Sequence, residues 1–198
     1  MKEVFLSNSV ELITQYNNNY TDEDIEKIKY GLEGLYLTVS KLIVIFLIAI
    51  VLGFFKELLL VLLFFNIIRF PAFGVHADKS STCLITSMVL ILGLTYLMIN
   101  ISVNINIKII ISIICLINYI LFAPADTVKR PLTNKKKRKY RKIASIIVAI
   151  IFIVAILSIK NMMFSNIILT ALILEAILIN PLMYKLMGMP YNNYKKIV

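Results

Sequence analysis

The 198-residue chain lacks tryptophan and has few acidic residues, histidines and cysteines. It contains 11 Asp and Glu against 21 Lys and Arg, and 60% of its residues are hydrophobic, with a mean hydropathy of +0.87. Soluble domains are only about 45–50% apolar, so this composition excludes a soluble globular protein. Six Gly and five Pro are too few for a collagen-like or low-complexity chain. The composition therefore predicts an all-α integral membrane protein.

The two cysteines, Cys83 and Cys115, are too few for a disulfide framework, and neither has the spacing of a zinc site. We therefore expect no metal and no cofactor. Cys115 lies in a run of Ile and Leu and is interpreted as a packing residue. For Cys83, a reactive thiol remains an alternative to packing.

Residues 1–36 are too acidic for a signal peptide, so we expect the N-terminus to lie in the cytoplasm. Apolar residues recur at helical spacing on both sides of an Asn-rich break at residues 17–19. Thr21 precedes three acidic residues, which is typical of an N-cap followed by the first turn of a helix. This region is predicted to form two amphipathic helices on the cytoplasmic face or the membrane surface.

Residues 37–184 contain apolar runs separated by charges, and these predict six membrane-spanning helices that form one domain. Their expected bounds are 37–55, 58–68, 84–101, 108–124, 143–159 and 162–184. A spanning helix needs about 20 residues, whereas the second run reaches only about 17 Å. We expect this short helix to tilt, to extend into its flanks or to end inside the membrane.

The positions of the basic residues predict the orientation of these helices. With the N-terminus inside, six crossings place residues 69–83, a basic loop at 124–142 and a tail at 185–198 in the cytoplasm. Eighteen of the 21 Lys and Arg then lie inside, as the positive-inside rule requires. We expect a multi-pass protein of the cell membrane with both termini in the cytoplasm, leaving outside only Lys56, Lys108 and Lys160.

The segment between the second and third predicted helices carries the only histidine, His76, together with Cys83. Pro71 and Gly74 predict that the second helix ends before His76, and Ser80 is a candidate N-cap that places Cys83 in the first turn of the third helix. A thiol at a helix N-terminus near an imidazole is typical of a cysteine nucleophile. The alternative is that Cys83 packs and that His76 is an interfacial residue.

The same segment resembles the signature of the accessory gene regulator protein B family, membrane cysteine endopeptidases (thiol proteases) of Gram-positive quorum sensing. Residues 123–132 also resemble the family, and the length and hydropathy fit over nearly the whole chain. Phe73 is a departure, because many members carry a second glycine at this position. The matching residues of the signature are Arg69, Gly74, His76, Ala77 and Cys83.

The resemblance implies that the protein cleaves a small pro-peptide at its C-terminal side and closes the remainder into a thiolactone or lactone ring, an autoinducing peptide. Cys83 would attack the scissile carbonyl to form a thioester, and His76 would act as base and then as acid. Arg69, Gly74 and Asp126 are candidate supporting residues. Asp126 could orient His76 if the two cytoplasmic segments meet, and the alternative is a helix-capping or solvated carboxylate.

The basic loop carries its basic residues from Lys129 to Lys142, with no acidic residue among them. We interpret it mainly as a topology anchor in contact with anionic lipids, with capture of an acidic peptide tail as a second role. Nucleic-acid binding is not expected, because only Tyr140 supplies an aromatic ring. The candidate substrate-binding residues are Lys129, Arg130, Lys135, Lys136, Lys137, Arg138 and Lys139.

An alternative function is a non-enzymatic membrane channel or peptide-exporter subunit. Such a protein typically has internal repeats or several charges within its spans. The chain has no repeat, and Glu175 is the one carboxylate inside a predicted span. We expect Glu175 to be neutral or to pair across helices, with a homodimer contact or a place in the lining of a peptide passage as the alternatives.

Overall fold

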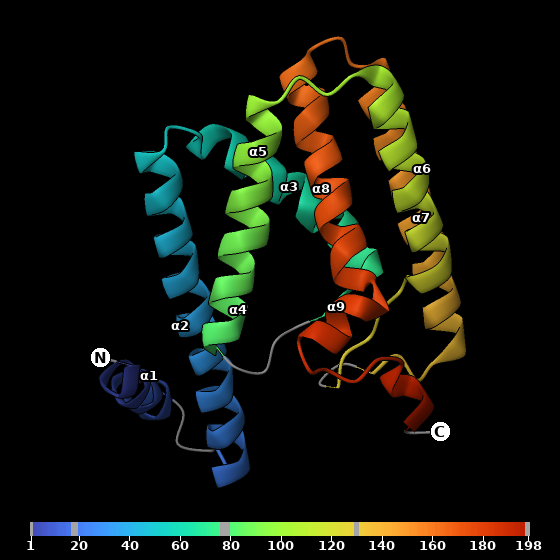
Figure 1. Ribbon diagram of the computed structural model, residues 1–198. Helices are drawn as coiled ribbons and strands as arrows, with labels where there is room; N and C mark the ends of the chain where they lie inside the picture. Colours follow the sequence, from blue (N-terminus) through green and yellow to red (C-terminus); the bar gives the residue numbers. More distant parts are fainter. Residues whose placement is uncertain (1, 17–19, 76–79, 129–130, 197–198) are drawn as a thin grey trace. The chain divides into compact units, whose positions relative to one another are not determined.

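The structure, a computed structural model, describes residues 2–16, 20–75, 80–128 and 131–196 (Figure 1). Over these residues it is helical and contains no strand beyond one isolated bridge between Phe73 and Ala125, so the predicted all-α fold is confirmed. The chain divides into two compact units, Met1–Val51 and Leu52–Val198. Each unit is described by itself.

The first unit consists of α1 (Lys2–Tyr16) and α2 (Asp22–Val51). Thr21 caps α2 as predicted, because its hydroxyl accepts from the Asp24 amide and the Asp24 carboxylate accepts from the Thr21 amide and hydroxyl. An ion pair of 2.7 Å between Lys2 and Glu33 joins the two helices. Because α2 is continuous, the predicted boundary at residue 36 falls inside one helix; the cytoplasmic place of residues 1–36 stays a prediction.

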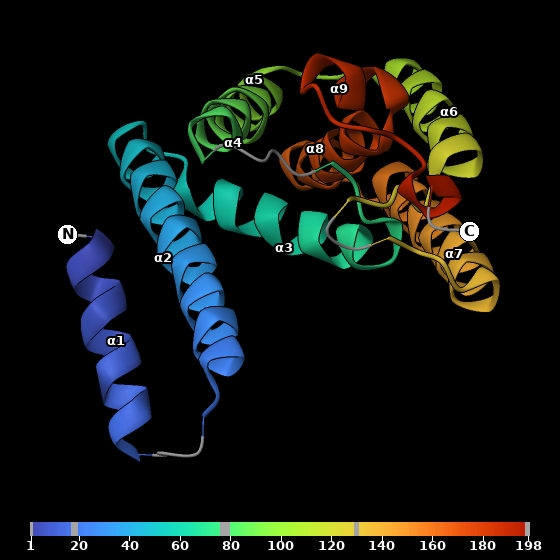
Figure 2. The same ribbon diagram turned by 90° about the horizontal axis from the view of Figure 1, so that it is seen from below.

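The second unit surrounds α8 with other helices. Of the 18 residues of α8, 12 are buried, and Figure 2 shows this helix among α3, α5, α6 and α7. The elements of this unit are α3 (Phe55–Ala72), α4 (Ser80–Ser87), the π-helical turn η1 (Met88–Gly93), α5 (Leu94–Asn100), α6 (Ile105–Phe122), α7 (Lys135–Ser158), α8 (Met162–Ile179), α9 (Pro181–Leu186) and the 3-10 turn η2 (Asn193–Lys196).

Five stretches in the described parts of the chain are long and apolar enough to cross a membrane: α2, Thr82–Asn100, α6, α7 and α8. The short second predicted span corresponds to α3, which extends beyond 58–68 at both ends to 18 residues, or about 27 Å. It carries charges near both ends, at Lys56, Glu57 and Arg69. Figure 2 shows α3 running across the bundle at a steep angle to α8. A total of six crossings stays a prediction.

The end of α3 before His76 is confirmed, but the break lies later than Pro71. This proline sits inside the last turn, and the Phe73 amide still donates to the Arg69 carbonyl at 2.9 Å. The helix ends because Phe73 and then Gly74 adopt positive φ angles of 65° and 117°. Phe73 thus occupies a backbone region that favours glycine.

The predicted loop at 124–142 is wrong for residues 135–142, which form the first two turns of α7. Asn134 caps this helix, since its side-chain oxygen accepts from the amides of Lys136 and Lys137. Lys and Arg are good helix formers, so the run of basic residues continues into the apolar part of α7 without a break.

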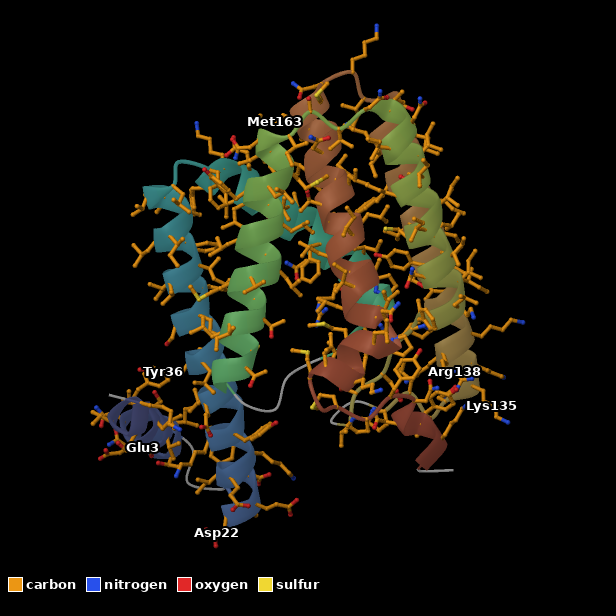
Figure 3. All side chains as sticks on the ribbon, viewed as in Figure 1. Glu3, Asp22, Tyr36, Lys135, Arg138 and Met163 are labelled. Atoms are coloured by element: carbon orange, nitrogen blue, oxygen red, sulfur yellow. The ribbon has the colours of Figure 1, made fainter. Side chains whose placement is uncertain are left out.

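The two ends of the second unit differ in the number of basic residues that they carry. Figure 3 places Met163 at one end and Lys135 and Arg138 at the opposite end. The helices α6 and α8 both start at the same end of the unit as Met163 (Figure 1). Lys108 and Lys160 lie near these two starts. This separation agrees with the predicted charge pattern; the side that faces the cytoplasm stays a prediction.

Candidate active site

A cavity of about 180 Å³ in the second unit contains Cys83. Arg69 from α3 and Val75, the residue before His76 in the sequence, line the same cavity. The π-helical turn contributes Leu90 to its wall, a departure from regular helix that is frequent at functional sites. The other lining residues are Phe65, Thr86, Ser87, Ile91, Leu174, Leu178 and Met187.

The two thiols have different surroundings. α4 begins at Ser80, so Cys83 lies in the first turn of the helix as predicted, and its side chain is half-buried. Cys115 on α6 is 4% exposed and belongs to the hydrophobic core, in agreement with its interpretation as a packing residue. His76 lies outside the described residues, so its predicted pairing with Cys83 stays a prediction.

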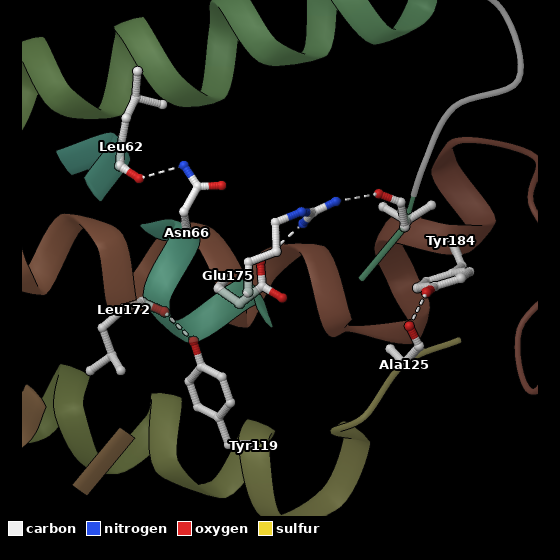
Figure 4. Close-up of polar contacts among 9 residues, drawn as sticks. Leu62, Asn66, Tyr119, Ala125, Leu172, Glu175 and Tyr184 are labelled. Carbon is white, nitrogen blue, oxygen red and sulfur yellow. Dashed lines mark hydrogen bonds and ion pairs between the residues drawn. The ribbon is translucent and has the colours of Figure 1, made fainter. Parts of the chain in front are cut away.

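A buried ion pair stands beside the cavity. Arg69 Nη1 lies 3.0 Å from Glu175 Oε2, and Arg69 Nη2 donates to the Val75 carbonyl at 3.2 Å (Figure 4). The side chain of Glu175 is fully buried and that of Arg69 is 18% exposed, so solvent reaches the pair only from the arginine side. The prediction that Glu175 pairs across helices is confirmed. Arg69 thereby ties the backbone after α3 to the C-terminal part of α8.

Gly74 fits closely against this pair. A Cβ at this position would stand 3.0 Å from Arg69 Nη1, 3.2 Å from Glu175 Oε1 and 3.3 Å from the Leu178 carbonyl oxygen. Its amide donates to the Ala125 carbonyl, and the next amide, of Val75, donates to Leu178. The absence of a side chain therefore lets the segment pass between α8 and the chain that follows α6.

The two segments predicted to be cytoplasmic do meet, through backbone hydrogen bonds of Ala125 with Ala72 and Gly74. Asp126 is 2% exposed, and its carboxylate accepts from the amides of Leu132, Asn193 and Tyr194. Among the described residues its role is thus to hold the C-terminal segment. An action of Asp126 on His76 stays a prediction, because that histidine is not described.

The C-terminal segment, predicted as a tail, packs on the body of the unit. Tyr184 donates to the carbonyls of Ala125 and Asp126, and Tyr191 donates to the Phe122 carbonyl at 3.3 Å. Burial, with Tyr194 and Asp126 nearby, raises the pKa of Tyr191 to about 12. Only the alternation of tyrosines with polar residues hinted at this packing in the sequence.

Two arginines of α7 contact the ends of other segments, which the sequence did not predict. Arg141 donates to the Phe70 carbonyl at 2.7 Å and lies 4.2 Å from the Phe73 ring centroid. Arg138 lies 3.7 Å from the Tyr194 ring centroid. Of the candidate substrate-binding residues, Lys129 and Arg130 are outside the described residues, and the exposed side chains are those of Lys135, Lys136, Lys137 and Lys139.

Fold and site together define a polytopic α-helical membrane protein with a half-buried thiol beside a buried ion pair. Comparison with known proteins gives the family: the chain belongs to the accessory gene regulator B family (AgrB), whose family model matches residues 7–179. This family takes part in accessory gene regulation, a quorum-sensing system, in which it works with a pro-peptide.

Individual relatives cover most of the chain. An AgrB-like protein of Listeria innocua is 33% identical over 175 residues, covering 88% of this chain and 86% of the relative. An AgrB-like protein of Clostridium acetobutylicum is 32% identical over 90% of this chain and 86% of its own length. The accessory gene regulator protein B of Staphylococcus aureus strain Newman is 31% identical, over 86% of this chain and 89% of its own. No solved structure matches the chain.

Proposed function

We propose that this protein is a membrane-embedded cysteine endopeptidase that cleaves a quorum-sensing pro-peptide at its C-terminal side and promotes cyclisation of the remainder. The observation that carries the proposal is the cavity shared by Cys83, Arg69 and Val75. It brings the first turn of α4 next to the backbone that leads to His76. Family membership supports the same reading.

In the proposed reaction, His76 removes the proton of the Cys83 thiol and the thiolate attacks the scissile carbonyl. The C–N bond breaks, His76 gives its proton to the leaving amine, and the N-terminal part of the peptide stays on Cys83 as a thioester. A thiol or hydroxyl of the bound peptide then gives its proton to the neutral His76 and attacks this thioester. The new ring forms, and the Cys83 thiolate is released.

Ring closure has to compete with hydrolysis, and the lining of the cavity favours closure. Leu90, Ile91 and Leu174 contribute apolar side chains to its wall, and the polar side chains that could hold a water molecule there are those of Arg69, Thr86 and Ser87. The thioester would therefore meet the tethered nucleophile of the peptide more often than water.

The Arg69–Glu175 pair supports this chemistry by position. Arg69 holds the Val75 carbonyl, and the Val75 amide is held by Leu178. Both polar groups of the residue before His76 are thus fixed to α3 and α8. We propose that this arrangement sets the path of the backbone into His76, so that its imidazole reaches Cys83.

The basic residues at the start of α7 serve this function by attracting an acidic part of the pro-peptide, and they anchor the protein with both termini in the cytoplasm of the cell. The exposure of Lys135, Lys136, Lys137 and Lys139 supports a role in capture rather than in bond making. The proposal also includes two points that rest on the sequence alone. Lys129 and Arg130 belong to the capture surface, and the protein forms a homodimer.

The proposal is tested by co-expressing the protein with the pro-peptide encoded beside its gene and weighing the peptide products. Cys83→Ala and His76→Ala are expected to abolish cleavage while membrane insertion persists. Cys115→Ala is the matched control, a buried thiol outside the cavity, and is expected to keep cleavage. Normal processing by a well-inserted Cys83→Ala protein would remove the enzyme proposal and favour the channel or exporter alternative.

A further inference from the structure

A large groove lies between α3 and α7, away from the candidate active site. Its volume is about 760 Å³, and we call it the α3–α7 groove. The α3 wall is formed by Ile67, Phe70 and Pro71. The α7 wall is formed by Lys136, Lys137, Tyr140, Arg141, Ala144 and Val148.

The α7 wall changes from charged to apolar along the helix. Its residues recur at spacings of three and four and therefore share one face. Lys136 and Lys137 lie at the start of this face, Arg141 one turn later, and Ala144 and Val148 in the next two turns. The distance along the axis from Lys136 to Val148 is about 18 Å. The groove thus has a cationic end and an apolar end.

The cationic end has no counter-charge within the described part of the second unit. The groove lining includes no Asp or Glu, and the side chains of Lys136 and Lys137 are exposed without a carboxylate partner among the described residues. Glu175 is paired with Arg69, and Asp126 accepts from backbone amides. An anion that neutralises the two lysines must therefore come from outside these residues.

We infer that the α3–α7 groove is a binding site for one anionic phospholipid. The phosphate lies at Lys136 and Lys137, and one acyl chain lies along Ala144, Val148 and Ile67. This ligand matches the groove at both ends, because a phospholipid changes from anionic to apolar over a comparable length. An acidic peptide is charged throughout and leaves the apolar end unfilled.

A lipid in this groove would contact the helix that leads to the candidate site. Arg141 lines the groove and also holds the Phe70 carbonyl and the Phe73 ring at the end of α3. The inference does not depend on the proposed reaction, but it assigns Lys136 and Lys137 to the lipid and leaves capture of an acidic peptide to Lys135 and Lys139, which lie outside the groove.

The absence of tryptophan from the chain permits a direct test. A single tryptophan is introduced as Val148→Trp, and the protein is placed in vesicles that contain either brominated phosphatidylglycerol or brominated phosphatidylcholine, which quench its fluorescence on contact. Quenching by the anionic lipid is expected to be the stronger. Ile147→Trp, on an exposed position outside the groove, is expected to show little preference. Equal quenching by the two lipids at position 148 would overturn the inference.

A pair of charge variants separates the groove from the general charge of the surface. Lys136→Gln with Lys137→Gln is expected to reduce the preference at position 148 by roughly 25-fold, because each Lys near an anionic lipid contributes about a factor of five. Lys135→Gln with Lys139→Gln removes the same charge from residues outside the groove and is expected to preserve most of it.

Two further outcomes would contradict a lipid site. An equal loss of preference in both charge variants means that surface charge alone attracts the lipid. Removal of the preference by a soluble acidic peptide at low concentration means that a peptide occupies the groove. Should Val148→Trp fail to insert, Ala144→Trp reports from the same groove face.

Discussion

Substituting Gly74 with alanine is predicted to destabilise the second unit strongly, for two separate reasons. The φ angle of +117° is a region that L side chains rarely adopt, and such strain costs about 1–3 kcal/mol. The new Cβ would also stand 3.0 Å from Arg69 Nη1 and 3.3 Å from the Leu178 carbonyl oxygen. Overpacking of this kind costs about 1–3 kcal/mol. The sum, about 2–6 kcal/mol, is a large part of a typical stability of about 5–15 kcal/mol.

Two other glycines of the same unit provide matched controls. Gly53 has a φ of +76°, but an added Cβ would meet no heavy atom within 4 Å. Gly53→Ala is therefore expected to reduce the free energy of unfolding only by the cost of the backbone strain. Gly93 lies in a helical conformation with open space around it, so Gly93→Ala is expected to be neutral or to gain up to about 1 kcal/mol.

The assay is unfolding of each purified variant in mixed micelles of increasing SDS content, followed by circular dichroism, together with its rate of pro-peptide cleavage. The expected order of stability is Gly93→Ala, then Gly53→Ala, then Gly74→Ala, and the last is expected to lose cleavage as well. A Gly74→Ala protein as stable as Gly93→Ala would refute the reasoning, because neither the strain nor the close approach would then matter.

Three other predictions follow from the polar contacts and the charge pattern. Glu175→Gln leaves the half-buried Arg69 without its anion and is expected to cost roughly 3–5 kcal/mol in the same SDS titration, with substantial recovery when both residues are replaced by methionine; equal stability of wild type and variant would contradict the pair's importance. Asp126→Ala removes the acceptor of two amides of the C-terminal segment, so hydrogen exchange there is expected to rise at least tenfold, and unchanged exchange would count against this contact. An impermeant thiol reagent applied outside the cell is expected to label a cysteine at Asn104 but not at Thr133, and the reverse pattern would invert the topology.

Local features of the chain were predictable from the sequence because they depend on neighbours in the sequence. Apolar runs of sufficient length give helices, Thr21 caps α2, and α4 begins where Ser80 had suggested. The start of α7 was placed too late, because a dense run of positive charge was interpreted as a loop although Lys and Arg favour helix.

Contacts between distant segments were harder to predict. Arg69 and Glu175 are 106 residues apart, and the sequence around either residue does not indicate that the two form a pair. The same holds for Asp126, whose carboxylate accepts from amides 67 and 68 residues away. Sequence reasoning identified Glu175 as a carboxylate inside a predicted span and Asp126 as a candidate supporting residue. It could not give the partner, because packing around α8 decides which charges meet.

The candidate site was assembled partly from the residues and partly from resemblance. Arg69, Gly74 and Cys83 do converge around one cavity or its edge, although they come from α3, the segment after it and α4. The place of His76 relative to Cys83 stays a prediction. The pairing of His76 with Cys83 is therefore tested by measuring the reaction itself.

The most direct test is intact-mass spectrometry of the purified protein quenched with acid during reaction with its pro-peptide. We predict a covalent adduct on Cys83 with the mass of the N-terminal peptide fragment less one water. Hydroxylamine is expected to remove this adduct, because it cleaves thioesters. Cys115→Ala is expected to form the same adduct, and Cys83→Ala none. Cleavage and cyclisation by Cys83→Ala, or an adduct on any other residue, would contradict the assignment of Cys83 as the nucleophile.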